Sequence, residues 1–400
     1  MISGKSPITI PGGLGAYAYN VAKILDSLGY KVYILGFSSQ KEQVSLDFAT
    51  LIHFVNPYER LLGLGAVMAS GLFVAEMEKV IEQEKPDELI VYSAAIWGVA
   101  GTKLKQKLRG SSIKLKTLVG YFTTHKHEYR GHVIGAPACD YGYRRSLFIR
   151  AAYLFARTVY SPIESRLLRG SDLVVVHYDS TRNILLSEFA GLDPEKVVKL
   201  PYYIDIYERK SELTIGSDAI RSGDVPTVSL ICRQDPRKGI NTFLKAAKIV
   251  RERGIAFNCL VAGAGVFHRH NMRLAKRLGL EGFVSFLGFV DSVDKVLDRT
   301  DIYVLPSVEE GSGAISLLEA MKKGVTILTT LCDGIPEDFV DHETAVLVPP
   351  NDPQRMAAAL EELLLDGNLR AALAANVRRD YAKRFTFEKM QEGLRGLLAQ

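Results

Sequence analysis

The clearest motif of the sequence is Pro306-Ser307-Val308-Glu309-Glu310-Gly311-Ser312-Gly313-Ala314-Ile315-Ser316-Leu317-Leu318-Glu319-Ala320-Met321. It follows the apolar run Ile302–Leu305, which predicts a buried strand, and its second half predicts a helix. The four residues 311–314 stand where backbone N–H groups at a helix start can bind a phosphate. Glu319 lies about one to two turns into the helix, where its carboxylate can accept hydrogen bonds from both hydroxyls of a ribose. Glu310 lies before the helix, nearer to a bound sugar.

Short apolar strands alternate with amphipathic helices along the whole chain. Strands are predicted in the first half at 32–35, 89–92, 118–122 and 173–176, and in the second half at 228–231, 260–262, 284–287, 302–305, 325–328 and 345–348. These runs are nearly continuous in apolar residues, as expected for parallel strands that are covered on both faces. The alternation therefore predicts an α/β protein built from doubly wound parallel sheets.

The length of 400 residues favours two domains. The segment Tyr207–Pro226 has few large apolar residues and many charged and small ones, which is typical of a linker. We therefore predict an N-terminal domain at 1–206, a C-terminal domain at 207–385, and a C-terminal helix at 386–400 that packs back on the N-terminal domain. Only Met1-Ile2-Ser3 is available for the first strand, so this strand is expected to be clipped, either by a start codon placed too late or because it is short.

Two further loops follow predicted strands and carry groups that bind anions. Arg233 and Lys238 lie in the loop Cys232–Gly239, where a planar guanidinium and an ammonium can converge on a diphosphate. The loop that ends in Gly13-Leu14-Gly15 leads into a helix, and its glycines let backbone N–H groups approach an anion. A dehydrogenase would also carry an acidic residue after its second strand, and Leu35-Gly36-Phe37-Ser38-Ser39 has none. Taken singly, each loop is also compatible with a plain turn or with ordinary surface charges.

Together, these motifs resemble glycosyltransferase family 4, a large family of retaining nucleotide-sugar glycosyltransferases with the GT-B fold. That fold consists of two Rossmann-like domains that face each other across a cleft. The likeness covers nearly all of the sequence and is closest from Val225 to about Lys383. It is carried by the Gly-Gly-x-Gly loop before residue 16, Arg233 with Lys238-Gly239, Val261–Gly265, Phe286–Val290 and Pro306–Met321.

The resemblance implies a role for each matching residue. In the family, the arginine and the lysine bind the donor diphosphate, the second glutamate binds the ribose, and the first glutamate lies beside the transferred sugar. A histidine at the position of His125 often faces that sugar. The catalytic residues implied are therefore Arg233, Lys238, Glu310 and His125. The donor-binding residues implied are Gly13, Gly15, Gly263, Phe289, Val290, Gly311, Ser312, Gly313, Ala314 and Glu319, with the base held by backbone groups at 289 and 290.

Two features depart from the family's pattern. Eight residues separate Glu310 from Glu319 where the family usually has seven, which implies a one-residue bulge and concerns Glu310 more than Glu319. The family's Pro-Asn-Gly-x-Asp at the domain crossover is replaced by Pro201-Tyr202-Tyr203-Ile204-Asp205, a change that concerns the acceptor side.

Metal binding is the alternative role for the histidines. His125, His127 and His132 lie close enough in sequence to suggest a metal site, but we expect no acidic or cysteine ligand to complete it. Family members need no metal, and no Asp-x-Asp pair occurs in the chain. We therefore expect no metal and no cofactor, because the nucleotide sugar is a substrate.

The charge distribution points to an anionic partner. Residues 101–170 hold fourteen Lys or Arg against three Asp or Glu, a net charge of +11 in a chain whose total is +5. Six arginines of this region (144, 145, 150, 157, 166 and 169) are interspersed with apolar and aromatic residues such as Leu147 and Phe148. Two interpretations stay open, a helix that lies on an anionic membrane surface and a core helix with an arginine-rich outer face. No nucleic-acid partner is expected.

These observations predict a retaining, metal-independent glycosyltransferase that moves a sugar from a nucleotide-sugar donor to a hydroxyl of a glycan or lipid-linked acceptor. The scattered cysteines and the absence of a visible signal peptide or of an apolar run of roughly 18 residues favour the cytoplasm, with the inner face of the membrane as a candidate location. The alternatives are a non-catalytic nucleotide-sugar-binding partner subunit and another GT-B enzyme, such as a sugar-nucleotide epimerase.

Overall fold

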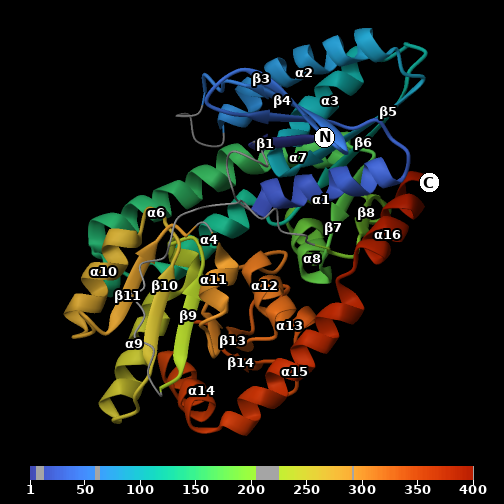
Figure 1. The fold of residues 1–400 in the computed structure, drawn as a ribbon. Coiled ribbons are helices and arrows are strands. Elements are labelled where there is room, and N and C mark those ends of the chain that lie inside the picture. Colours follow the sequence, from blue (N-terminus) through green and yellow to red (C-terminus); the bar gives the residue numbers. More distant parts are fainter. Residues whose placement is uncertain (6–12, 59–63, 204–224, 291, 400) are drawn as a thin grey trace. The chain divides into compact units, whose positions relative to one another are not determined.

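The computed structural model describes residues 1–5, 13–58, 64–203, 225–290 and 292–399 (Figure 1). The chain divides into two compact units. The first comprises Met1–Thr124, Arg157–Tyr207 and Phe385–Gln400, and the second comprises His125–Ala156 and Glu208–Arg384. Residues 125–156 thus group with the second unit, whereas the sequence placed them in a domain at 1–206. The predicted boundary between residues 206 and 207 lies outside the described residues.

The first unit contains an eight-stranded sheet in the order β3-β4-β2-β1-β5-β6-β7-β8. Its strands are β1 (Ile2–Lys5), β2 (Tyr33–Phe37), β3 (Glu42–Leu46), β4 (Ala49–Phe54), β5 (Glu88–Ala94), β6 (Lys114–Gly120), β7 (Leu173–Val176) and β8 (Val197–Lys199). Neighbouring strands pair in parallel except for β3, which forms an antiparallel hairpin with β4. The sheet is therefore parallel at its centre and mixed at one edge.

The helices of this unit, with the π-helical segment η2 that leads into it, are α1 (Gly13–Ser27), α2 (Leu64–Glu84), η1 (Ala95–Gly98), α3 (Val99–Lys107), η2 (Ala156–Tyr160), α7 (Ser161–Gly170), α8 (Asp179–Glu188), η3 (Pro194–Lys196) and α16 (Phe387–Ala399). A cluster of aromatic rings, which includes Phe37, Phe54 and Phe73, fills the core between the sheet and α2. The last helix, α16, belongs to this unit, and the Lys116 ammonium donates a hydrogen bond to the carbonyl of Leu397 at 2.9 Å.

The second unit contains a six-stranded, fully parallel sheet in the order β11-β10-β9-β12-β13-β14. Its strands are β9 (Thr227–Ile231), β10 (Asn258–Ala262), β11 (Val284–Gly288), β12 (Ile302–Leu305), β13 (Thr326–Thr330) and β14 (Val346–Val348). Counted within the unit, the order is 3-2-1-4-5-6, which is the Rossmann arrangement. The order reverses between β9 and β12, so the loops after these two strands flank the switch point.

Helices cover both faces of this sheet. The helices of the second unit are α4 (His125–Gly135), α5 (Ala138–Tyr141), α6 (Tyr143–Phe155), η5 (Pro236–Lys238), α9 (Ile240–Glu252), α10 (His268–Arg277), α11 (Val293–Leu297), α12 (Ile315–Lys323), α13 (Ile335–Asp338), α14 (Pro353–Leu365) and α15 (Gly367–Arg384). The main core cluster joins β-strand residues such as Val228 to Phe243 of α9 and Leu360 of α14. Among the described residues, no helix combines the length and the apolar character needed to cross a bilayer.

Candidate active site

The two ligand-binding loops predicted in the second half of the chain meet at the switch point of the second sheet. One loop follows β9 and carries Arg233 and Lys238, and the other follows β12 and carries Glu310. Gly239 holds the loops together, because its φ is +63° and a Cβ there would lie 1.9 Å from the carbonyl oxygen of Pro306. Ligands of open α/β sheets bind at this edge, beyond the carboxyl ends of the strands. The structure thus unites side chains that are more than seventy residues apart in the sequence.

Lys238 and Glu310 form a buried ion pair. The ammonium of Lys238 contacts both carboxylate oxygens of Glu310, at 2.5 and 2.7 Å, and the Ser307 hydroxyl donates a further hydrogen bond to the same carboxylate. The lysine side chain is 9% exposed and the glutamate side chain 3%. A charge buried to this degree is stable only with its partner, so each group fixes the position of the other.

Arg233 lies at the rim of the site with its side chain 58% exposed. Its Nε donates to Asp235 at 2.7 Å, and its Nη2 donates to Glu128 of α4 at 3.1 Å. Because this guanidinium is open to solvent, its contact with the half-buried Glu128 can be exchanged for another anion more readily than its contact with Asp235, whose side chain is 6% exposed.

Arg237 is a third cation of the site and was not among the residues predicted from the sequence. Its guanidinium is 13% exposed, its Nη1 donates to Glu309 at 3.0 Å, and its Nε lies 3.6 Å from both Glu128 and Asp235. Burial opposes the charge, but the carboxylates of Glu309, Asp235 and Glu128 together raise its pKa well above the usual value. Its place one residue before Lys238, at the carboxyl end of a strand, is the signal that would have marked it.

Helix α4 packs directly against these loops through two glycines. A Cβ on Gly131 would lie 2.5 Å from Cβ of Glu309, and a Cβ on Gly135 would lie 1.9 Å from the carbonyl oxygen of Pro236. This close approach brings Glu128 to the two arginines. Although burial opposes its ionisation, Arg237 and Arg233 hold the pKa of Glu128 below its usual value. His125 is the first residue of α4 and is half-buried.

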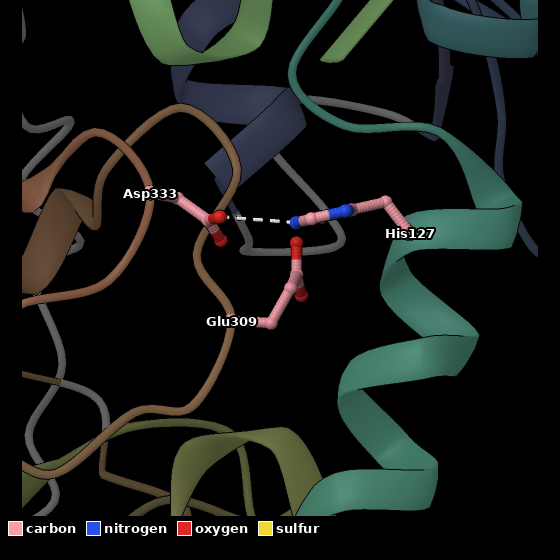
Figure 2. Close-up of side chains that lie close together, drawn as sticks. All are labelled: His127, Glu309 and Asp333. Carbon is pink, nitrogen blue, oxygen red and sulfur yellow. Dashed lines mark hydrogen bonds and ion pairs between the residues drawn. The ribbon is translucent and has the colours of Figure 1, made fainter. Parts of the chain in front are cut away.

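Figure 2 shows a cluster in which His127 of α4 points toward Glu309 and Asp333 from two loops of the second unit. The ligand atoms of the three residues lie within 4.8 Å of one another, and His127 Nε2 lies 3.0 Å from Asp333 Oδ1. Acidic groups thus do lie near the histidines, contrary to what the sequence suggested. However, Arg237 already pairs with Glu309, and two backbone amides bind Asp333. The cluster is therefore better described as a hydrogen-bonded network than as a cation site.

Asp333 binds the turn that leads into α12. Its Oδ2 accepts hydrogen bonds from the backbone N–H groups of Glu310 and Gly311, at 2.8 and 2.9 Å. Burial raises the pKa of this carboxyl, but His127 and the two amides outweigh burial and hold the pKa below its usual value. Gly311 and Gly313 have φ values of +58° and +72°, which glycine adopts without strain. An internal carboxylate on these amides demonstrates that the turn holds an anion.

The other predicted residues of the second unit lie around the same edge of the sheet. Ser312 is buried, and Ala314 caps α12. Glu319 is half-buried on that helix, and burial together with repulsion from Asp294 raises its pKa to about 8. Phe289 and Val290 follow β11, with the Phe289 ring 57% exposed.

The remaining predicted donor-binding glycines lie in both units. Gly263 packs against the β9 loop, because a Cβ there would lie 2.0 Å from the carbonyl oxygen of Cys232. Gly13 and Gly15 lie in the first turn of α1 in the first unit, and the preceding residues 6–12 are outside the described part of the chain. The second unit alone thus gathers Arg233, Arg237 and Lys238 at one anion-binding turn.

The second unit is similar in sequence to proteins of a known family. Residues 220–380 match the family model described as glycosyl transferases group 1. The matched residues lie within the second unit and are similar to this family. The predicted resemblance is confirmed at this level, and the assignment to family 4 within it stays a prediction.

Several named relatives align with part of this chain. A phosphatidyl-myo-inositol mannosyltransferase of Mycolicibacterium smegmatis is 30% identical over 52% of this chain and 59% of the relative. A GDP-mannose-dependent α-(1-6)-phosphatidylinositol monomannoside mannosyltransferase of Mycobacterium tuberculosis is 28% identical over 59% of this chain and 66% of the relative. A lipopolysaccharide core biosynthesis glycosyltransferase of Rhizobium meliloti is 30% identical over 44% and 50%. The chain thus spans between half and two thirds of these relatives.

Solved structures match over the full length of the chain. Sucrose-phosphate synthase from Thermosynechococcus elongatus superimposes with a TM-score of 0.78 at 18% identity, over 100% of this chain and 97% of that one. Anabaena HepE in complex with UDP and glucose gives a TM-score of 0.70 at 15% identity, over 100% and 98%. These likenesses confirm the predicted GT-B fold class, with two α/β units built on predominantly parallel sheets.

Proposed function

We propose that the protein is a glycosyltransferase that moves a sugar from a nucleotide-sugar donor to an acceptor hydroxyl. One observation carries the proposal: Arg233, Arg237 and Lys238 gather with an anion-holding turn at the switch point of the second sheet. This set suits a diphosphate, because two guanidinium groups, an ammonium and backbone amides are all donors to phosphate oxygens.

The proposed reaction needs stabilisation of the leaving nucleotide. Breaking the bond between sugar and phosphate leaves negative charge on the diphosphate, and in this scheme the three cations stabilise that charge as it develops. Because protein groups supply this positive charge, we propose that no metal ion is required. Sugar transfer then proceeds with retention, by attack of the acceptor hydroxyl on the face from which the nucleotide leaves. Glu310 and His125 position the sugar in this scheme.

The remainder of the donor is assigned to residues along the same edge of the sheet. Glu319 binds the ribose hydroxyls, and the backbone at Phe289 and Val290 holds the base. Gly263 keeps the β9 and β10 loops close enough for the donor to lie across them. The turn at Ser312, Gly313 and Ala314 binds the phosphates in this scheme, and Gly13 and Gly15 stay predicted donor-binding residues.

We propose that the acceptor is a glycan or a lipid-linked sugar and that the protein works on the cytoplasmic side, at an anionic membrane surface. Two of the relatives are named for phosphatidylinositol or its monomannoside, and a third for lipopolysaccharide core biosynthesis. Acceptors of these classes are anchored in or built at membranes, which supports a peripheral location. Neither a nucleic acid nor a cofactor has a part in the scheme.

A thermal-shift screen across nucleotide sugars tests the donor assignment. A nucleotide sugar present at about 100 times its Kd should stabilise the full chain by about 2.7 kcal/mol. Arg233→Ala should weaken this stabilisation, whereas Arg355→Ala, an exposed position on α14, should leave it unchanged. Donor hydrolysis or transfer by the purified protein separates an enzyme from a binding subunit. If no nucleotide sugar stabilises the chain, or if Arg233→Ala responds like wild type, the donor assignment is wrong.

A further inference from the structure

Helix α6 exposes an apolar face to solvent. Tyr143 is 75% exposed, Leu147 55% and Phe148 71%. These residues recur at helical spacing and so lie along one side of the helix, which is about 20 Å long. The opposite side is buried, where Ile149 packs in a small cluster with Tyr141. The exposed apolar face of α6 is therefore separate from the buried face, which packs the helix against the rest of the unit.

The same helix is strongly basic. It carries Arg144, Arg145 and Arg150 and no acidic residue. Arg144 and Arg150 are exposed, whereas the guanidinium of Arg145 lies on the inner side, 5.2 Å from the ring centroid of Phe267. Exposed arginines thus accompany the exposed apolar side chains on the outward side.

The combination of exposed apolar and exposed basic side chains favours an anionic membrane surface as the partner. A core helix would bury Leu147 and Phe148, and surface hydrophobic residues that cluster in this way mark interaction sites. A nucleic acid would match the arginines but leave the leucine and the aromatic rings in water. The interface of a bilayer that contains anionic lipids takes both, because apolar side chains enter below the headgroups while arginines meet the lipid phosphates.

We propose that α6 is a membrane-docking helix that lies on the surface of a bilayer containing anionic lipids, with Tyr143, Leu147 and Phe148 inserted and Arg144 and Arg150 on the headgroups. This inference rests on the proposed function at an anionic membrane surface, and α6 is the part of the chain that makes the contact. Helix α4, which packs against α6, also exposes an apolar and a basic residue, Ile134 and Arg130.

Vesicle sedimentation with the full chain tests the inference. The protein is mixed with vesicles of phosphatidylcholine alone, or of phosphatidylcholine with phosphatidylglycerol, at low and at high salt. Wild type should sediment with the acidic vesicles only, and less so at high salt. The double variant L147S/F148S should bind at least about tenfold more weakly. The double variant R144A/R150A should lose about fivefold for each arginine.

A matched control comes from α14, where Leu365 and Arg355 are also exposed. The double variant R355A/L365S should bind acidic vesicles like wild type. The inference is overturned if wild type does not bind acidic vesicles, or if both α6 variants bind them as tightly as wild type. It is also overturned if L147S/F148S instead dissociates a dimer in sedimentation velocity, since a second copy would then cover the face. Stabilisation by nucleotide sugars should be equal in all variants, so failure of the membrane contact is distinguishable from failure of the donor assignment.

Discussion

Replacement of Lys238 by methionine tests the centre of the proposed site. Methionine keeps an unbranched stem but removes the ammonium. The buried carboxylate of Glu310 then keeps the Ser307 hydroxyl and, at 3.9 Å, the guanidinium of Arg237 as neighbouring donors. Breaking a buried ion pair by removal of one partner costs about 3–5 kcal/mol. Urea unfolding of Lys238→Met should show a loss of that size.

Loss of stability must be separated from loss of chemistry. The double variant K238M/E310Q removes both charges of this pair, so neither is left buried without its partner and most of the lost stability should return. Turnover is then compared with that of E310Q alone, which retains the lysine. The double variant should be slower by about 10²-fold or more, the effect of losing one donor to the charge that develops in the transition state. If K238M/E310Q turns over as fast as E310Q, Lys238 has only a structural role and the assignment of the diphosphate site is refuted.

Three other substitutions probe the same site. Glu128→Gln frees the two arginines that this carboxylate contacts and should tighten donor binding about fivefold by calorimetry, whereas weaker binding would mean that Glu128 helps to hold the donor. Glu319 has its pKa raised by burial from 4.5 to about 8, so native stability should fall by up to about 1.4 kcal/mol per pH unit as the pH rises from 4.5 to 8. Glu319→Gln should flatten that fall in thermal unfolding, and an unchanged slope would contradict the assigned burial. Gly239→Ala places a Cβ 1.9 Å from the carbonyl oxygen of Pro306 at a φ of +63°. The variant should lose more than about 1 kcal/mol of unfolding free energy and should also bind the donor more weakly. Wild-type stability together with wild-type affinity would contradict the contact between the loops.

The second sheet was predictable strand by strand, and the first was not. The central strands β9, β12 and β13 are buried along their whole length, and each overlaps the apolar run from which it was predicted. The hairpin β3–β4 escaped prediction because Glu42–Leu46 alternates between half-buried and exposed side chains at the edge of the sheet. The strand β8 has three residues, too few for a pattern.

The site was predictable where it follows local motifs. The sequence could indicate Arg233, Lys238 and Glu310 as candidates because each lies in a loop that follows an apolar strand. Asp333 was missed, since it reaches the turn at Gly311 only through the fold. Glu128 was missed for a related reason: no local pattern tells that α4 packs on the second unit rather than the first.

The charges of the site indicate how a donor would have to enter it. Three cations, Arg233, Arg237 and Lys238, contact four carboxylates, and a fifth, that of Asp333, holds the turn. With neutral histidines the formal sum is three minus five, or −2, so an added diphosphate would be repelled unless a carboxylate leaves. Lys238 is closed in by its buried pair, whereas the pair of Arg233 with Glu128 is accessible. On the proposed assignment, the phosphates take the place of Glu128, and donor binding and the position of α4 are coupled reciprocally.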